Sequence, residues 1–318
     1  MIHGVLLINK KAGSTSHDVV CSLRHIIGQK AVGHAGTLDP MAEGLILILL
    51  GYGTKLSNYL LTNDKRYHFV LRLGVTTDTL DKTGQIIEKK RVQLSITKVK
   101  QVLERSQGTL SLPVPLVSAV KIKGKKLYEY KRENKPVIPP VRDMTFYDLD
   151  IKEIQSETAR VELSCSKGSY VRSWVSFIGD ELGTGACLEG LVRLRSVPFN
   201  INSSLTVQQV ADKWSHQENL NQGQILQMLE PAFIPFSKAL PHIPSVSVKK
   251  EDEKRLKYGK ISGNLKMALE DQQKEINKSE NAETIRIMNY NNEQMVALLE
   301  LRPFLSPKFI KVFPQGLY

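Results

Sequence analysis

Three features are scarce in this 318-residue sequence, and each scarcity excludes a class of protein. Cysteine occurs only three times, scattered and without a C-x-x-C pair, which argues against a disulfide framework or a zinc site and is typical of a reducing cytoplasm. No apolar run is long enough to span a bilayer, the longest being the strand-sized residues 45–50. Residues 1–10 are apolar but end in lysines instead of a small-residue cleavage site, so we expect a cytoplasmic protein without a secretion signal.

Acidic residues are also in deficit, because 44 basic residues face 32 acidic ones and give a net charge of +12. A basic surface attracts a polyanion at long range, and phosphate contacts release counterions. The net charge alone does not decide whether the protein binds a nucleic acid, because many basic proteins do not. The hydrophobic and charged fractions, 41% and 24%, are those of an ordinary globular protein. The length suits one large domain or two unequal ones.

Strand-like and helix-like patterns alternate over the first two thirds of the chain. Ser14-Thr15-Ser16 is a typical N-cap, and apolar residues at helical spacing follow it until Gly28, which predicts a helix. A glycine-rich loop is expected over residues 33–44. Strands are predicted at residues 4–8, 45–50, 67–73, 144–154 and 159–165, and further helices at 96–103, 126–133 and 171–182. This irregular order favours a mixed sheet in an α/β or α+β fold over strict βαβ units.

Three prolines within residues 235–244 predict a domain boundary near residue 240. We therefore expect a large domain over residues 1–240 and a small one over residues 241–318. The charged stretch 271–281 is interpreted as a solvated loop. In the small domain the patterns predict one helix at residues 249–257 and strands at residues 284–288, 295–301 and 309–313.

The most unusual stretch is G-H-A-G-T-L-D-P, residues 33–40. Its glycines let a ligand approach the backbone closely, and the carboxylate of Asp39 and the imidazole of His34 are candidate reactive groups there. The alternative is that Asp39, which precedes Pro40, caps an Asx-turn without any chemical role. Taken by itself, the stretch favours this alternative.

Cations and aromatic residues gather in several other places. Lys65 and Arg66 precede Tyr67, and the basic run K-I-K-G-K-K at residues 121–126 leads into Tyr128. A third group is formed by Lys167, Tyr170 and Arg172. Each group alone is most simply a solvated charged face, but cations bind phosphates and aromatic faces stack on unpaired bases. Together with the glycine-rich loop, they favour folded RNA with an exposed loop as a partner.

Competing kinds of active site fit the sequence poorly. There is no Walker A sequence and no G-x-S-x-G, and Gly51-x-Gly53 lacks the third glycine of a dinucleotide site. Ser16-His17-Asp18 is contiguous, so its side chains splay apart and cannot form a triad. The histidines show no metal-ligand spacing. The remaining hypothesis is carboxylate chemistry on RNA without a cofactor or a metal.

Residues 33–44 closely resemble the catalytic motif of the TruB family of tRNA pseudouridine synthases. The resemblance extends from about residue 2 to residue 200, and residues 241–318 resemble the PUA domain that follows in this family. It implies an α+β fold: a catalytic domain of pseudouridine synthase type, with a mixed, mainly antiparallel sheet, and a small β-rich RNA-binding domain. Further motifs occur in family order: Lys10-x-x-Gly13-x-Thr15-Ser16, Lys65-x-Tyr67, Pro115-x-x-Ser118-Ala119-x-Lys121, Gly124-x-x-x-Tyr128 and Cys165-Ser166-Lys167-Gly168-x-Tyr170-Val171-Arg172.

The resemblance implies that the substrate is the uridine at position 55 in the T-loop of tRNA. Asp39 matches the nucleophile, and Tyr67 matches the tyrosine that stacks on the target base and takes the C5 proton. Arg172 matches the arginine that pairs with the carboxylate, and His34 matches a histidine that holds the flipped-out nucleotide. The other expected substrate-binding or supporting residues are Lys10, Gly36, Thr37, Lys65, Lys121, Lys167 and Tyr170. The resemblance implies a monomer that contacts the T-arm.

Two other functions remain open from the sequence. One is a guide-RNA-dependent synthase of the dyskerin type, which shares the motif and works with partner proteins. The other is a tRNA-binding folding factor whose catalysis is secondary. For any of them, a base hidden in a folded loop must be extruded at a cost of a few kcal/mol. Stacking on Tyr67 would return about 1–3 kcal/mol of that cost.

Overall fold

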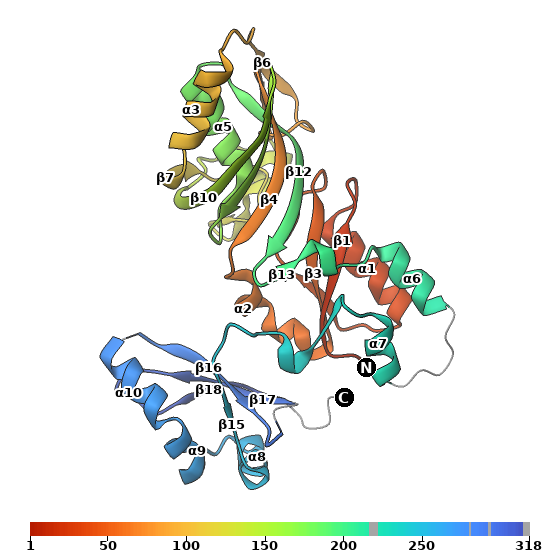
Figure 1. Ribbon diagram of the computed structural model, residues 1–318, viewed down its shortest axis with the longest axis vertical. Helices are drawn as coiled ribbons and strands as arrows, with labels where there is room; N and C mark the ends of the chain where they lie inside the picture. Colours follow the sequence, from red (N-terminus) through yellow and green to blue (C-terminus); the bar gives the residue numbers. More distant parts are fainter. Residues whose placement is uncertain (216–221, 280, 292–293, 314–318) are drawn as a thin grey trace.

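The computed structural model describes residues 1–215, 222–279, 281–291 and 294–313, and its largest element is a ten-stranded sheet (Figure 1). The strands are β1 (Gly4–Lys10), β2 (Val32–Ala35), β3 (Glu43–Leu50), β4 (Lys65–Leu73), β7 (Gly108–Pro113), β10 (Val141–Ile154), β11 (Thr158–Cys165), β12 (Ala186–Ser196), β13 (Phe199–Asn200) and β14 (Phe233–Pro235). The order is β14-β1-β3-β12-β4-β11-β10-β7, with β2 paired to β3 and β13 to β12. Within this described sheet every pair is antiparallel except β12 with β3. The prediction of a mixed, mainly antiparallel sheet is confirmed.

Helices cover the sheet in two groups, one at the upper end of the molecule and one beside β1 lower in the view (Figure 1). Phe69 of β4 and Phe146 of β10 pack on Trp174, with ring centroids 5.8 and 6.0 Å apart. The indole nitrogen of Trp174 donates to the carbonyl of Ser106 at 2.9 Å, so the ring is buried without an unsatisfied donor. The helices and short elements of this part are α1 (Ser16–Ile27), η1 (Gly51–Leu56), α2 (Ser57–Leu61), β5 (Val75–Thr77), β6 (Ile86–Lys89), α3 (Ile96–Arg105), α5 (Val171–Leu182), η2 (Ile201–Ser203), α6 (Val207–Ser215), α7 (Gln222–Met228) and η3 (Phe236–Lys238).

Local signals placed five strands of the sheet and three of these helices correctly. Thr15 caps α1, and its side chain and that of Asp18 form a reciprocal capping box. Gly28, at φ 67°, ends α1 in the left-handed conformation, and Gly183, at φ 73°, ends α5 in the same way. The predicted strands and helices of the first 182 residues are confirmed, with bounds that differ by at most three residues.

Two differences from the prediction concern the sheet near the glycine-rich loop. Residues 33–35, predicted as loop, belong to β2, which pairs with β3. Strand β12 was not predicted at all, because Glu189, Gly190, Arg193 and Arg195 interrupt its apolar pattern. A register shift at Gly190 marks a bulge in the same strand. Burial between β3 and β4, which is a tertiary effect, makes this segment a central strand.

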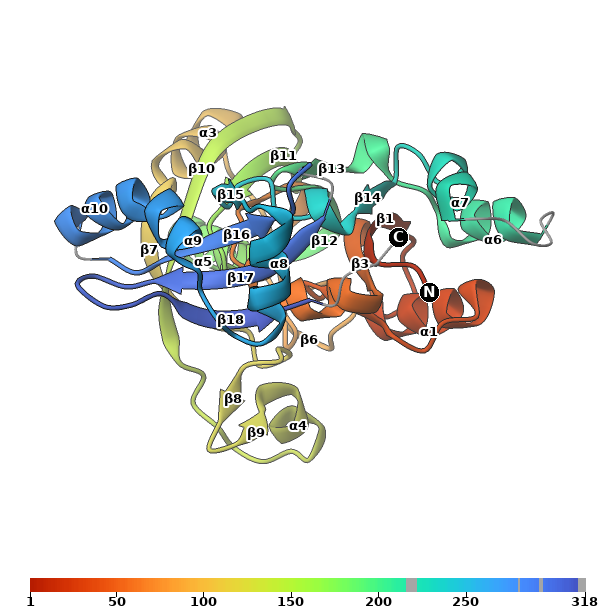
Figure 2. The ribbon, with the colours of Figure 1, turned by 90° about the horizontal axis from the view of Figure 1, so that it is seen from below.

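A small lobe projects from the body of the protein (Figure 2). It consists of β8 (Lys121–Ile122), β9 (Lys125–Lys126) and α4 (Leu127–Arg132). Residues 121–132, called the basic lobe below, contain six basic residues and one acidic residue. Leu127 is buried and anchors the lobe, whereas Lys121 and Lys123 are exposed.

The C-terminal segment forms a second sheet of four strands, β15-β16-β17-β18, with its own apolar core. Phe313 extends from this segment onto the large domain, where it packs against Phe236 with ring centroids 4.7 Å apart and against Tyr52 at 6.2 Å. The predicted helix and three strands of this segment are confirmed. The elements are β15 (Ser245–Ser247), α8 (Lys250–Lys257), α9 (Gly263–Ala268), α10 (Glu270–Ser279), β16 (Glu283–Met288), β17 (Met295–Leu301) and β18 (Lys308–Val312).

The interpretation of residues 271–281 as a solvated loop was wrong, because α10 covers nearly all of this stretch. Ile276 is buried in the second core. The side chain of Gln273 donates to the carbonyl of Arg302 at 2.9 Å, and that of Asn277 accepts from the amide of Phe304 at 2.9 Å. One buried apolar residue gives no helical period, so only these tertiary contacts reveal the helix. Within the described residues, no helix is both long and apolar enough to cross a membrane.

Candidate active site

A cavity of about 280 Å³ opens beside the loop that carries Asp39. Seven predicted site residues line it: Gly36, Thr37, Asp39, Lys65, Tyr67, Tyr170 and Arg172. The other lining residues are Leu38, Leu61, Ser118, Ala119, Gly168, Ser169, Val171, Leu191 and Arg193. A larger hollow of about 560 Å³ lies beside Pro40 and Met41, but no predicted site residue lines it. The predicted site residues therefore gather around the smaller cavity.

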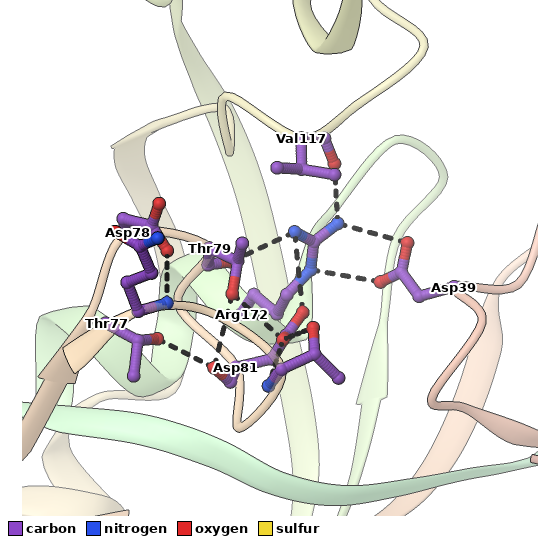
Figure 3. A network of polar contacts seen from close by, with 9 residues as sticks. Asp39, Thr77, Asp78, Thr79, Asp81, Val117 and Arg172 are labelled. Carbon is purple, nitrogen blue, oxygen red and sulfur yellow. Dashed lines mark hydrogen bonds and ion pairs between the residues drawn. The ribbon is translucent and has the colours of Figure 1, made fainter. Parts of the chain in front are cut away.

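Asp39 and Arg172 form a two-pronged ion pair in this cavity (Figure 3). The Nε of Arg172 lies 3.0 Å from Oδ2 of Asp39, and its Nη2 donates to Oδ1 at 3.1 Å. The same guanidinium donates to the carbonyls of Thr79 at 3.1 Å and Val117 at 2.9 Å. The side chain of Arg172 is 3% exposed and that of Asp39 is 31% exposed. The buried arginine thus fixes the orientation of the Asp39 carboxylate, which stays accessible from the cavity.

A second carboxylate, Asp81, stands on the other side of Arg172 (Figure 3). Its Oδ2 lies 3.9 Å from Nη1, and its side chain is 6% exposed. Thr79 donates its hydroxyl to Asp81 at 2.9 Å, and the amide of Thr83 donates at 2.9 Å. The sequence analysis missed Asp81, because its turn, T-T-D-T-L-D-K-T, shows only turn-forming residues. Its proximity to Arg172 arises from tertiary folding.

The surroundings of Asp39 act on its pKa in opposite directions. Burial raises the pKa of Asp39, the guanidinium of Arg172 opposes this rise, and the charge of Asp81 adds to it. The nearby ammonium of Lys10 also lowers the Asp39 pKa. A carboxylate must be ionised to act as a nucleophile, so Arg172 has an electrostatic as well as a geometric task.

The loop of residues 36–42, called the Asp39 loop below, is held from beneath by buried polar groups. The hydroxyl of Ser16 accepts from the amide of Leu38 at 2.9 Å and donates to the carbonyl of Leu38 at 3.1 Å. The ammonium of Lys10 donates to the carbonyls of Ser14 at 2.8 Å, Lys11 at 3.1 Å and Pro40 at 3.4 Å. Lys10 is 1% exposed and does not line the cavity, so in this structure it supports the loop.

Gly44 lies in β3, just after this loop, where β3 meets β12. It pairs with Arg193 of β12 in the parallel register, and its φ is +100°. A Cβ atom at this position would lie 2.4 Å from the carbonyl oxygen of Arg193, which no real side chain tolerates. The last glycine of the motif is therefore required by close backbone packing.

Tyr67 and Lys65 form the β4 wall of the cavity. Burial raises the pKa of Tyr67 to about 12, and the guanidinium of Arg193 opposes this rise. Burial and, to a smaller extent, the charge of Arg193 lower the pKa of Lys65 to about 8. The ammonium of Lys65 donates to the carbonyls of Leu61, at 2.9 Å, and Asn63. The wall thus combines an aromatic ring with a cation that keeps its charge at neutral pH but loses it at a lower pH than an ordinary lysine does.

Besides Lys10, the structure places three predicted residues outside the cavity lining. His34 lies in β2, where burial lowers its pKa, and its Nδ1 has no hydrogen-bond partner among the described residues. Lys167 is exposed at the turn after β11, next to the lining residue Gly168. Lys121 is exposed on the basic lobe. Their predicted contacts with RNA stay predictions.

The fold of this chain is shared with solved structures of other proteins. Among solved structures, the chain is similar to the Cbf5-Nop10-Gar1 complex, with a TM-score of 0.71 and 22% identity over 98% of this chain and 84% of that one. It is equally similar to the archaeal box H/ACA sRNP Nop10-Cbf5 complex, with a TM-score of 0.70 and 21% identity over 99% and 88%. These are likenesses of fold. The class is given by relatives in sequence, which are named tRNA pseudouridine synthases, so the protein is one of the pseudouridine synthases, enzymes that isomerise uridine.

Sequence comparison gives the family within this class. Residues 24–171 match the model of the N-terminal domain of TruB family pseudouridylate synthases. The chain is 41% identical to a tRNA pseudouridine synthase B of Bdellovibrio bacteriovorus, over 84% of each chain. It is 36% identical to a tRNA pseudouridine synthase B of Bacillus cytotoxicus, over 81% of this chain and 83% of that one. The chain belongs to the TruB family of pseudouridylate synthases.

Proposed function

We propose that this enzyme isomerises the T-loop uridine at position 55 of tRNA to pseudouridine by covalent catalysis from Asp39. The observation that carries the proposal is the carboxylate of Asp39, which is accessible in the cavity and held on both oxygens by Arg172. The substrate follows from the family's members, since the relatives described above are tRNA pseudouridine synthases B.

The reaction begins with the target uridine extruded into the cavity, since its reactive atoms are hidden in a folded loop. Ionised Asp39 forms a covalent bond to the nucleotide, either at C1′ of the ribose or at C6 of the base, and the bond between N1 and C1′ breaks. The base turns and forms a new bond from C5 to C1′. The C5 proton passes to the oxygen of Tyr67, N1 takes up a proton from solvent, and the bond to Asp39 breaks, which regenerates the free carboxylate. Nothing is oxidised or reduced, so the reaction consumes no co-reactant.

Tyr67 has two proposed tasks in this sequence. Its ring stacks on the extruded base and replaces stacking lost from the RNA, an effect worth about 1–3 kcal/mol per base. Its oxygen takes the C5 proton. With a pKa raised to about 12, the resting phenol is protonated at neutral pH, so this second task requires the hydroxyl to lose its own proton first. The positive charge of Arg193 favours that loss.

The partner of this site is the T-arm of tRNA. The basic lobe supports this proposal, since the ammonium of Lys125 lies 5.0 Å from the ring centre of Tyr130 and that of Lys126 lies 5.3 Å from Tyr128. Such pairs offer charge to phosphates and flat surfaces to bases. Residues 1–240 form the catalytic domain in this proposal, and residues 241–318 form a PUA-like RNA-binding domain. The enzyme acts as a monomer in the cytoplasm.

A second candidate is a synthase that depends on a guide RNA, and the likeness of fold to the Cbf5 complexes favours it. One experiment separates the two candidates. Purified protein is mixed with an unmodified tRNA transcript labelled with tritium at uridine C5, and released tritium is counted. A matched transcript carries cytidine at position 55. We expect release from the first transcript, with pseudouridine mapped to position 55, and no such product from the second. No release from bare tRNA would contradict the proposal.

A further inference from the structure

Arg193 of β12 is the second guanidinium in the cavity lining. It is 2% exposed, and its donors reach both sides of the Asp39 loop. Nε donates to the carbonyl of Leu45 at 2.6 Å, and Nη2 donates to the carbonyl of Gly36 at 3.2 Å. Gly36 and Leu45 flank Asp39 along the chain, so one planar group bridges the entry and the exit of the loop that carries the carboxylate.

The backbone of the same residue joins the other wall of the cavity. Arg193 pairs with Tyr67 of β4 in the antiparallel register and with Gly44 of β3 in the parallel register. Its side chain and main chain therefore connect the Asp39 loop, β3 and the strand that carries Tyr67. The two groups proposed to act on uridine come from segments of the chain that meet at this residue.

The charged surroundings of Arg193 differ from those of Arg172. Arg172 faces two carboxylates, whereas no carboxylate among the described residues lies within ion-pair distance of Arg193. Burying an unpaired cation is costly, and a methionine would fill a similar volume without that cost. We infer that Arg193 contributes to the site through the hydrogen-bond donors and the charge of its guanidinium, and not through its volume.

We propose that Arg193 is a positioning residue for the isomerisation, because its guanidinium ties the Asp39 loop to the Tyr67 strand and so sets the separation of carboxylate and phenol. This inference rests on the proposed function. A misplacement of about 1 Å between reacting groups costs roughly 100-fold in rate. Loss of the hydrogen bonds from Arg193 should therefore lower the rate of the chemical step. It should leave RNA affinity unchanged, because the RNA contacts that determine affinity lie elsewhere.

The test compares Arg193→Ala and Arg193→Lys with the control Arg195→Ala, which removes an exposed arginine two residues further along the same strand. Single-turnover rates are measured at saturating tRNA transcript, and Kd is measured separately by filter binding. For Arg193→Ala we expect a rate about 100-fold lower, with Kd almost unchanged. Added guanidinium ions restore part of this rate, because they refill the vacated site with a planar donor, and an equal concentration of sodium chloride does not. The control keeps the wild-type rate.

Arg193→Lys keeps the charge but lacks the planar fork that reaches two carbonyls. We expect it to fold and to react at a rate between those of the wild type and the alanine variant. If the alanine variant does not fold, the rate of Arg193→Lys alone tests whether Arg193 is a positioning residue. A wild-type rate in either variant, or a loss confined to Kd, would overturn the inference. Inactivity of the wild type on tRNA would instead reject the proposed function, on which this inference rests.

Discussion

The cavity and the basic lobe use the same kinds of cation in opposite ways. Lys10, Arg172 and Arg193 are buried, and their donors point at carbonyls or carboxylates of the protein itself. On the basic lobe, Lys121 and Lys123 are exposed. From this comparison we infer that the buried cations hold the reacting groups in place and so determine the rate, while the exposed cations attract the polyanion and so determine affinity and its salt dependence.

After Asp39 itself, the largest effect within the cavity is expected from Tyr67→Phe. The ring remains for stacking but the oxygen is lost, so we expect binding close to wild type and a single-turnover rate lower by about 10²–10⁴-fold, the usual contribution of general acid–base catalysis. The measurement is tritium release at saturating transcript. Full activity would leave Tyr67 with stacking alone.

Arg172→Gln tests the buried side of the comparison directly. Without the guanidinium, the Asp39 carboxylate loses its two-pronged partner, and we expect a rate lower by about 10²–10³-fold. Arg172 opposes the rise in the Asp39 pKa, so its removal raises that pKa further. Because the ionised carboxylate reacts, the acidic limb of the pH–rate profile should move to higher pH. An unshifted profile would contradict this electrostatic role.

Asp81→Asn should have a smaller effect. It removes the charge 3.9 Å from Nη1 of Arg172 but keeps a side chain that accepts from Thr79 and Thr83. Hydrogen bonds to charged groups contribute about 1.5–3 kcal/mol, so we expect the rate to fall roughly 10- to 100-fold with little change in Kd. An Asp78→Asn variant is the control, since Asp78 pairs with Lys131 and does not contact Arg172. Equal losses in both variants would refute a specific role for Asp81.

The smallest effect on rate is expected on the basic lobe. In Lys121→Gln and Lys123→Gln, tRNA affinity should weaken and the slope of log Kd against log salt should flatten by about one for each lost phosphate contact. The single-turnover rate at saturation should not change. Lys131→Gln is the matched control, because its ammonium is already paired with Asp78 at 2.6 Å. A lower rate at saturating tRNA in the Lys121 or Lys123 variant would contradict the claim that the exposed cations of the basic lobe act on affinity alone.

The sequence predicts the parts of this protein that are fixed by local rules. Capping residues and glycines marked α1 and α5, and the glycine-rich motif identified Asp39. Two residues whose place in the site arises only from tertiary folding were not predicted from the sequence. Asp81 lies in a turn of ordinary composition, and Arg193 lies in a strand whose charges conceal its burial.

The same reasoning explains the wrong interpretation of residues 271–281. Helix α10 buries only Ile276 in the second core, and its other anchors, Gln273 and Asn277, bind the backbone of a distant turn. Polar anchors of this kind leave no periodic signal in a sequence. For the site, the family resemblance brought together seven residues that the structure also places around one cavity, but it gave no account of what holds the Asp39 loop in place.

The central claim is that Asp39 is the nucleophile, and Asp39→Asn tests it most directly. The amide has nearly the same shape and keeps oxygen and nitrogen atoms near Arg172, but it cannot attack. Pseudouridine in the T-loop is quantified under single turnover, and tRNA affinity is measured in parallel. We predict affinity close to wild type and no pseudouridine. Pseudouridine formed at the wild-type rate would contradict the account.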